Sequence, residues 1–324
     1  MRISKVLSVL LSFLSGVLSC RAQMNFLKFP HGVDVAYWAA RPLEKGDPAA
    51  EYAVIYIHGL DSKINDSSAT WKAIVKKHPR ARRTIFIKPA FFSRTNCHKK
   101  LLGKVALWDT KTHDWRRGDL SLGDRGVSSY AVIDRIFELL ADRARYPKLK
   151  HILLCGFSAG GQVVNRYVAV GKLVPAKHLD YSFAVGAPSS YLYIDGRRLA
   201  PDGTFKIPDP PVPGLEAWHD GLQGRCAYAA GLTEKEILDN LAARPTLFMC
   251  GEEDVKPRGL VVTPGAMTQG ENRYQRFLNY RKYIALYPAW AKRCRFVAVP
   301  GFGHQWSRVF AAPELVKFVY GERE

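Results

Sequence analysis

The feature that most constrains this chain is a strand, sharp turn and helix pattern around one serine. The apolar run 151–155 leads into Gly156-Phe-Ser158-Ala-Gly160, and apolar residues at helical spacing follow over 163–168. Glycine has no Cβ, so Gly156 and Gly160 let the strand and the helix pass close together at a strained turn. The pattern predicts an exposed serine hydroxyl at a helix N-terminus, where negative charge is favoured. The alternative is a glycine-rich turn with an incidental serine.

Strands alternate with helices along most of the chain. This order predicts an α/β fold with a mostly parallel central sheet and helices on both faces. Near the start, 25–30 and 33–39 alternate apolar and polar residues around His31-Gly32, which predicts an antiparallel hairpin. The later predicted strands are 51–57, 84–88, 151–157, 181–186, 245–250 and 295–299, and the predicted helices are 67–77, 128–140, 234–243, 272–286 and 312–320.

Two segments interrupt this alternation. Residues 90–127 are long and irregular, and 187–232 are rich in Pro, Gly, Tyr and Trp. Loops of this length are uncommon unless they are functional, and we expect about 187–232 to form a small cap. Aromatic side chains in or next to these segments either line a substrate pocket or pack in the core, and they are Trp108, Trp115, Tyr191, Tyr193 and Trp218.

Residues capable of acid–base chemistry follow several of the predicted strands. His58 follows the strand 51–57, Asp254 follows 245–250 and His304 follows 295–299. The carboxyl ends of parallel strands meet at one edge of a sheet, so we expect these side chains to lie near Ser158. His58 is expected to organise its own turn, and His304 could instead be an ordinary loop histidine. Two further acids stay open in place of Asp254, and they are Glu253 and Asp195.

Four motifs together resemble the α/β-hydrolase superfamily over residues 25–322. They are His58-Gly59-Leu60, the turn at Ser158, Gly251-Glu-Glu-Asp254 and Gly301-Phe-Gly-His304, and the order Ser, Asp, His is the one typical of that superfamily. Within it, residues 156–168, 189–193, 269–273 and 303–304 resemble those of secreted bacterial esterases and polyester depolymerases. The resemblance implies a single α/β-hydrolase domain over 25–324, with the cap-like insertion at about 187–232.

The resemblance also implies a role for each site residue. Ser158 would be the nucleophile, His304 its base and Asp254 the acid that orients the imidazole. The backbone N–H groups of Leu60 and Ala159 would hold the oxyanion, and such a donor contributes about 3 kcal/mol to lowering the barrier. This machinery supplies nucleophile, base and charge stabilisation, so neither an organic cofactor nor a metal is expected.

The predicted function is that of a serine hydrolase that forms an acyl-enzyme. Its most favoured substrate is a small-molecule or polymeric carboxylic ester. Two alternatives stay open: an amide or peptide hydrolase with the same triad, and a catalytically silent module that binds a polymer.

The first 22 residues are typical of an export signal. Arg2 and Lys5 precede a mainly Leu, Val and Ser stretch over 6–18, which is too short to span a membrane as a helix. Residues 17–20 resemble a lipoprotein cleavage box that would leave lipidated Cys20 at the N-terminus, whereas an ordinary cleavage before Gln23 is the alternative. We therefore expect a secreted, periplasmic or cell-envelope protein, with membrane attachment if Cys20 is lipidated.

Basic residues give the chain a formal net charge of +19. They are scattered, and no nucleic-acid motif accompanies them, so we expect a solvated cationic surface and no nucleic-acid partner. Attraction to anionic polymers or surfaces is the alternative.

The cysteines have no zinc-site spacing, so we expect no structural metal. Cys155 and Cys250 are predicted to be buried free thiols in central strands. In an oxidising compartment, two of the three residues Cys97, Cys226 and Cys294 could form a disulfide.

Overall fold

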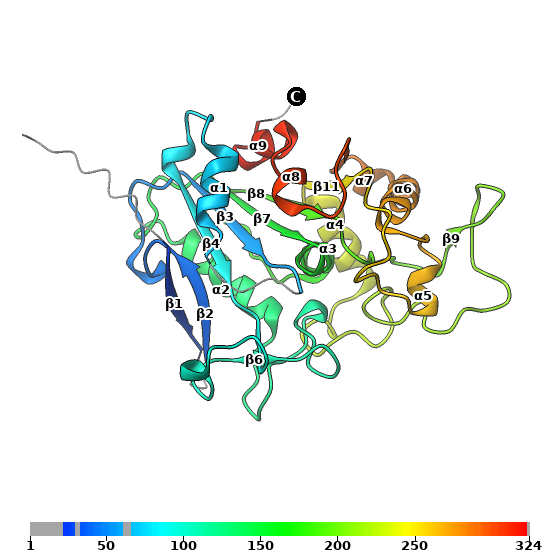
Figure 1. The fold of residues 1–324 in the computed structure, drawn as a ribbon, viewed down its shortest axis with the longest axis horizontal. Coiled ribbons are helices and arrows are strands. Elements are labelled where there is room, and N and C mark those ends of the chain that lie inside the picture. Colours follow the sequence, from blue (N-terminus) through cyan, green and yellow to red (C-terminus); the bar gives the residue numbers. More distant parts are fainter. Residues whose placement is uncertain (1–21, 30–32, 61–65, 323–324) are drawn as a thin grey trace, which may run out of the picture.

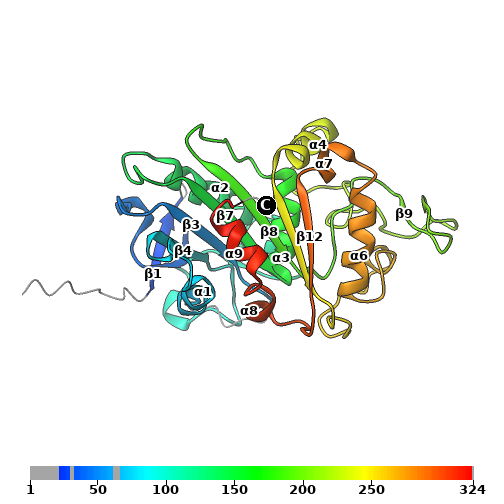
Figure 2. The same ribbon diagram turned by 90° about the horizontal axis from the view of Figure 1, so that it is seen from above.

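One twisted, mainly parallel sheet organises the chain in a computed structural model that describes residues 22–29, 33–60 and 66–322. Figures 1 and 2 show the sheet from two directions. Within these residues eight strands pair in the order β1-β2-β4-β3-β7-β8-β11-β12. Their bounds are β1 Gln23–Lys28, β2 Asp34–Ala39, β3 Tyr52–Ile57, β4 Thr84–Pro89, β7 His151–Phe157, β8 Asp180–Gly186, β11 Thr246–Gly251 and β12 Cys294–Val299.

Strand direction divides the sheet into two parts. From β4 to β12 every pairing is parallel, whereas β1 and β2 form an antiparallel hairpin whose second strand runs antiparallel to β4. β3 and β7 are buried along their whole length, as expected for strands covered on both faces. The predicted α/β class, the hairpin and the parallel centre are therefore confirmed.

Helices cover both faces of the sheet. The α1–α8–α9 side packs its aromatic rings on β3, as Trp71 and Phe310 do on Tyr56, whereas Tyr167 of α3 contacts Phe137 of α2 on the other side. The helix bounds are α1 Ser68–Val75, α2 Ser129–Ala141, α3 Ala159–Val170, α4 Glu234–Ala243, α5 Pro264–Met267, α6 Arg273–Ile284, α7 Pro288–Ala291, α8 Trp306–Val309 and α9 Pro313–Val319.

Local sequence explains where two of these helices begin. The Ser128 hydroxyl accepts a hydrogen bond from the Tyr130 N–H at 3.1 Å and caps α2. At α4, Thr233 and Glu236 form a capping box in which each side chain binds the other residue's backbone N–H. Both helices were predicted from the sequence, and their observed starts follow from these caps.

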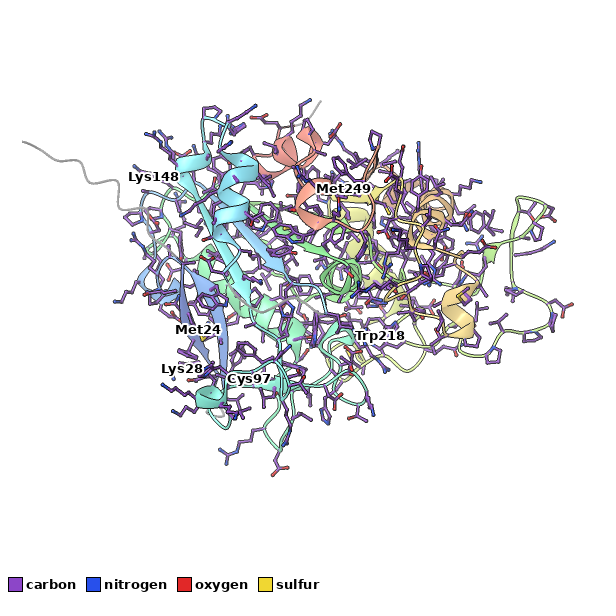
Figure 3. All side chains as sticks on the ribbon, viewed as in Figure 1. Met24, Lys28, Cys97, Lys148, Trp218 and Met249 are labelled. Carbon is purple, nitrogen blue, oxygen red and sulfur yellow. The ribbon has the colours of Figure 1, made fainter. Side chains whose placement is uncertain are left out.

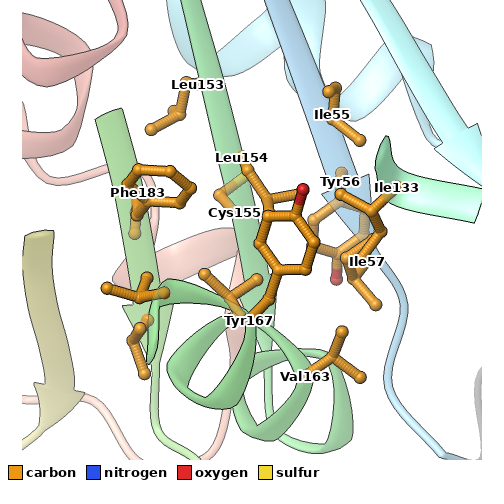
Figure 4. Close-up of a cluster of buried hydrophobic side chains, with 14 of the residues drawn as sticks. Ile55, Tyr56, Ile57, Ile133, Leu153, Leu154, Cys155, Val163, Tyr167 and Phe183 are labelled. Atoms are coloured by element: carbon orange, nitrogen blue, oxygen red, sulfur yellow. The ribbon is translucent and has the colours of Figure 1, made fainter. Parts of the chain in front are cut away.

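The core is continuous between β3, β7 and α3. Figure 4 shows Ile55, Tyr56 and Ile57 of β3 beside Leu153, Leu154 and Cys155 of β7, with Val163 and Tyr167 of α3 packed against them. Burying one such aliphatic or aromatic side chain stabilises the fold by about 1.5–3 kcal/mol. This packing holds α3 against the carboxyl ends of the strands, where Ser158 lies.

Short elements appear within the two irregular segments. The strands are β5 Phe92–Ser93, β6 Leu107–Trp108, β9 Arg198–Leu199 and β10 Phe205–Lys206, and the 3₁₀ helices η3 Lys99–Leu101 and η4 Trp115–Arg117 lie among them. Elsewhere, η1 is Leu43–Lys45 and η2 is Ala81–Arg83. The β9–β10 hairpin projects beyond α5 and α6 (Figure 1). A cap role for 187–232 remains a prediction.

The cysteines form no disulfide among the described residues. Cys155 and Cys250 are buried and free, as predicted, and Cys97, Cys226 and Cys294 are free as well. The disulfide left open for these three is therefore absent from the structure. Cys20 and the rest of the predicted signal peptide up to residue 21 lie outside the described residues, as does the His31-Gly32 turn. No helix between residues 22 and 322, where described, is long and apolar enough to cross a membrane.

We predict that Gly160→Ala destabilises the protein by about 2 kcal/mol or more, because a Cβ at this position would lie 2.1 Å from the Ile57 carbonyl oxygen. Urea unfolding followed by circular dichroism measures the change. The control is Gly231→Ala, where a Cβ would meet nothing within 4 Å. Equal stability of the two variants would contradict the close approach.

Candidate active site

Ser158 occupies a strained turn between β7 and α3. Its backbone angles are φ 59° and ψ −119°, in a region that residues with a Cβ rarely adopt. The Ser158 N–H donates to the Gly186 oxygen at the end of β8, 2.8 Å away. A Cβ at Gly156 would lie 2.3 Å from the Gly160 oxygen, so both glycines are required by the tight turn. The surrounding backbone therefore holds the serine in place.

Two backbone segments border Ser158. Ala159 begins α3, and the first N–H groups of a helix have no partner within it. The turn after β3 lies alongside, since a Cβ built on Gly59 would be 3.9 Å from the Ser158 Cβ. Leu60 follows Gly59 directly. The two residues predicted to supply oxyanion donors thus border the serine.

His58 is buried beneath this turn and holds its shape. Its Nε2 accepts a hydrogen bond from the Phe91 N–H at 3.1 Å, so Nδ1 carries the proton and donates to the Gly59 oxygen at 2.8 Å. Burial, together with the charge of Lys88, lowers the pKa of His58 to about 3. Trp115 packs on the ring at a centroid distance of 4.8 Å. A neutral, packed imidazole fits the predicted organising role.

His304 and Asp254 form a hydrogen-bonded pair. His304 Nδ1 lies 2.6 Å from Asp254 Oδ2, and the acid is 1% exposed whereas the histidine is 32% exposed. An ionised carboxylate only accepts hydrogen bonds, so Nδ1 carries the proton and Nε2 is left as the acceptor. That tautomer is the one a general base needs.

The two alternative acids lie elsewhere in the network. Glu253 is exposed, and its backbone N–H binds the Phe302 oxygen at 3.0 Å. The Asp195 carboxylate accepts hydrogen bonds from Arg197, Tyr283 and Tyr287. Of the three candidate acids, Asp254 is the one hydrogen-bonded to His304.

Arg273 is a neighbour of Asp254 that the sequence did not reveal. Its Nη1 lies 3.7 Å from Asp254 Oδ1, and its Nη2 donates to the Gly259 oxygen at 2.7 Å. Both side chains are almost fully buried. Asp254 thus lies between an imidazole and a guanidinium, although 19 positions separate it from Arg273 in the sequence. No sequence motif signals that contact.

Phe157 connects the serine turn to the histidine loop. Its ring centroid is 4.9 Å from that of the His304 imidazole. In the described part of the chain, no hydrogen bond joins the Ser158 hydroxyl to His304. Such catalytic contacts are often long in a free enzyme and tighten when substrate binds.

The five aromatic residues weighed as pocket lining are all buried. Trp108 and Trp115 pack with Phe91, and the Tyr191 and Tyr193 rings contact Tyr280 of α6. The Trp218 indole N–H donates to the Arg117 oxygen at 2.8 Å. All five have at most 5% exposure, so the packing interpretation holds for each of them.

A buried polar cluster joins α3 to the cap-like segment. Arg166 is fully buried and donates to the Ser190 hydroxyl at 3.0 Å and to the His219 carbonyl at 2.8 Å. Asp220 accepts from Ser190 at 2.6 Å. Burial lowers the pKa of Arg166, while the Asp220 charge opposes that change. The helix that follows Ser158 is therefore tied to segment 187–232, a link that the sequence did not predict.

No group of three or more His, Cys, Asp or Glu side chains suited to a metal ion occurs among the residues described.

The sequence matches no protein-family model and no curated protein. Solved structures share its fold. A poly(3-hydroxybutyrate) depolymerase from Bordetella parapertussis is 19% identical with a TM-score of 0.61, and the match covers 93% of this chain and 90% of that one. A poly(aspartic acid) hydrolase from Sphingomonas sp. KT-1 is 18% identical with a TM-score of 0.61, over 92% of this chain and 98% of that one. The chain has the α/β-hydrolase fold that its motifs predicted.

We expect Asp254→Asn to lower kcat for ester hydrolysis by about 10⁴-fold, because the amide no longer fixes the required imidazole tautomer. Steady-state kinetics on a soluble chromogenic ester measures this loss. Glu253→Gln and Asp195→Asn are matched controls that should stay within about threefold of the unchanged protein. A large loss in either control with normal Asp254→Asn activity would move the acid role.

Burial of neutral His58 predicts a pH-dependent stability. Its folded pKa of about 3 lies below the ordinary value of 6.5, so between these values the unfolded chain binds a proton that folded His58 does not. The contribution of His58 to the free energy of unfolding is fully present above pH 6.5. It falls by about 1.4 kcal/mol per pH unit below that value. The free energy of unfolding, measured with urea between pH 7 and 4, should depend less steeply on pH for His58→Gln than for the unchanged protein. Equal slopes would contradict the assignment.

Proposed function

We propose that this protein is a serine hydrolase that cleaves carboxylic esters through an acyl-enzyme on Ser158. The observation that supports this most is the hydrogen bond of 2.6 Å between His304 and buried Asp254, on the same sheet edge as the strained Ser158 turn. Nucleophile, base and orienting acid come from three different strand ends. Their convergence at one edge favours catalysis over a binding role.

Each step of the proposed reaction uses a named group. His304 Nε2 takes the Ser158 proton as Oγ attacks the ester carbonyl, and Asp254 stabilises the resulting imidazolium. The N–H groups of Leu60 and Ala159 stabilise the oxyanion. His304 then protonates the departing alcohol, and a water activated by the same imidazole releases the acid from Ser158.

The proposed substrate class is a small-molecule or polymeric ester. One fold neighbour is a poly(3-hydroxybutyrate) depolymerase, which supports a polyester among the candidates. A second candidate is amide hydrolysis by the same machinery, because the other neighbour is a poly(aspartic acid) hydrolase. Parallel assays with acyl esters of increasing chain length, insoluble polyesters and matching amides distinguish the two.

We also propose that the protein acts outside the cytoplasm. The charged start, the short apolar stretch over 6–18 and the box ending at Cys20 support export, with lipidation or simple cleavage as the two routes. Mass spectrometry of the N-terminal peptide from exported protein distinguishes a lipidated Cys20 from an unmodified start at Gln23.

Ser158→Ala should abolish both ester turnover and labelling by a fluorophosphonate probe, because no other group supplies the attacking oxygen. The fold should persist, since the hydroxyl caps no helix. Labelling is read by mass spectrometry and turnover by absorbance. Ser307→Ala, a serine in α8 near His304 in the sequence, is the control that should keep both. Absence of labelling in the unchanged, folded protein would favour the silent binding module.

A further inference from the structure

A group of exposed basic residues lies at the sheet edge opposite Ser158. Four segments lead directly into the parallel strands β4, β7, β8 and β12, and they are 76–83, 143–150, 172–179 and 292–293. Together they contain thirteen Lys or Arg residues and no Asp or Glu, and all thirteen basic side chains are exposed. Because the strands are parallel, the four segments lie at one edge, which we call the amino edge.

Neighbouring acids neutralise part of this charge. Glu51 forms ion pairs with Arg83 and Lys150, Glu322 pairs with Arg80, and Asp142 pairs with Arg145. Asp180 adds one exposed acid at the start of β8. A large positive excess therefore remains across the width of the sheet from β4 to β12.

The opposite edge has a different charge balance. The loops that hold Asp254 and His304 span 252–263 and 300–305, and they contain three acids and two basic residues, with His304 counted as neutral. The four segments of the amino edge are thus more basic than the loops that hold Asp254 and His304. Figure 3 shows Lys148 on the side of the molecule where α1 lies, away from the lower side where Trp218 is labelled.

The described chain begins beside the middle of the sheet. β1 begins with Gln23 paired to Ala39, the last residue of β2. β2 runs antiparallel to β4 and so toward the amino edge, and its Trp38 pairs with Lys88 in the carboxyl half of β4. Glu44 follows β2 in the chain, and its backbone oxygen accepts a hydrogen bond from the Arg145 side chain at 2.9 Å. The chain after β2 therefore lies beside segment 143–150. Gln23 is three residues after Cys20, the predicted lipidation site.

We propose that the amino edge docks on an anionic lipid membrane and keeps the Ser158 edge facing the water. Each Lys or Arg near an anionic bilayer adds attraction, and a single acyl chain anchors a protein only marginally without a second signal such as a basic patch. The basic segments of the amino edge supply that second signal. Docking through the opposite edge would cover the catalytic loops.

The test compares two variants of the full chain with equal changes of charge. The amino-edge variant carries Lys76→Glu, Lys77→Glu, Lys148→Glu and Lys292→Glu. These four side chains are exposed and form no ion pair within the part of the chain that the structure describes. The control variant carries four such changes on the connection after β4, and they are Lys99→Glu, Lys100→Glu, Lys104→Glu and Lys111→Glu. Both keep the same N-terminal residues, so the contribution of that segment cancels.

Binding is measured by co-sedimentation with vesicles of phosphatidylcholine alone or mixed equally with phosphatidylglycerol. The unchanged chain should prefer the anionic vesicles at about 0.1 M salt and lose that preference at about 1 M salt. The amino-edge variant should bind anionic vesicles about 100-fold more weakly, and the control variant within about threefold of the unchanged chain. Equal loss in both variants, no preference for anionic lipid, or binding to soluble polyphosphate but not to vesicles would overturn the proposal.

Orientation has its own readout. Turnover of a water-soluble ester should stay within about twofold when the protein is bound to vesicles, because the catalytic edge faces the water. Loss of turnover on binding would overturn the orientation. This readout rests on the proposed function, whereas sedimentation does not, so failure of one is distinguishable from failure of the other.

Discussion

The close contact between α3 and the ends of β3 and β7 is the constraint on which the rest of the site depends. A Cβ at Gly156 or Gly160 would lie too close to a backbone oxygen, and Ser158 has a positive φ between them. This geometry places Ser158 at the N-terminus of α3, where negative charge is favoured. The turn at His58 and the loops after β11 and β12 are arranged around that point.

Buried charges and hydrogen bonds then hold the neighbouring loops. Asp254 is buried between His304 and Arg273, and an ionised group in such a position is stable only with partners. Arg166 joins α3 to Ser190 and His219 in the cap-like segment. The loops that would contact substrate are thus anchored by polar contacts, whereas the sheet below is held by apolar packing. Thirteen exposed basic side chains lie at the amino edge.

Much of the fold could be predicted because its signals are local. The β3 and β7 runs, the cap at Ser128 and the capping box at Thr233 each depend on a few adjacent residues. The candidate site could also be predicted from the sequence, since Ser158, Asp254 and His304 each follow a strand, and parallel strands end at one edge. The disulfide left open among Cys97, Cys226 and Cys294 is absent from the structure. Cysteine spacing does not reveal which side chains meet.

The sequence by itself determined the α/β order, the glycine-flanked serine turn and the placement of acid and histidine after late strands, because backbone sterics and hydrophobic periodicity act over short distances. Only the tertiary structure decided which acid meets His304, that Arg273 lies behind it, that the five aromatic residues pack in the core, and that the basic segments share one edge. These outcomes depend on contacts between residues far apart in the sequence. Such contacts exist only once the strands are ordered in the sheet.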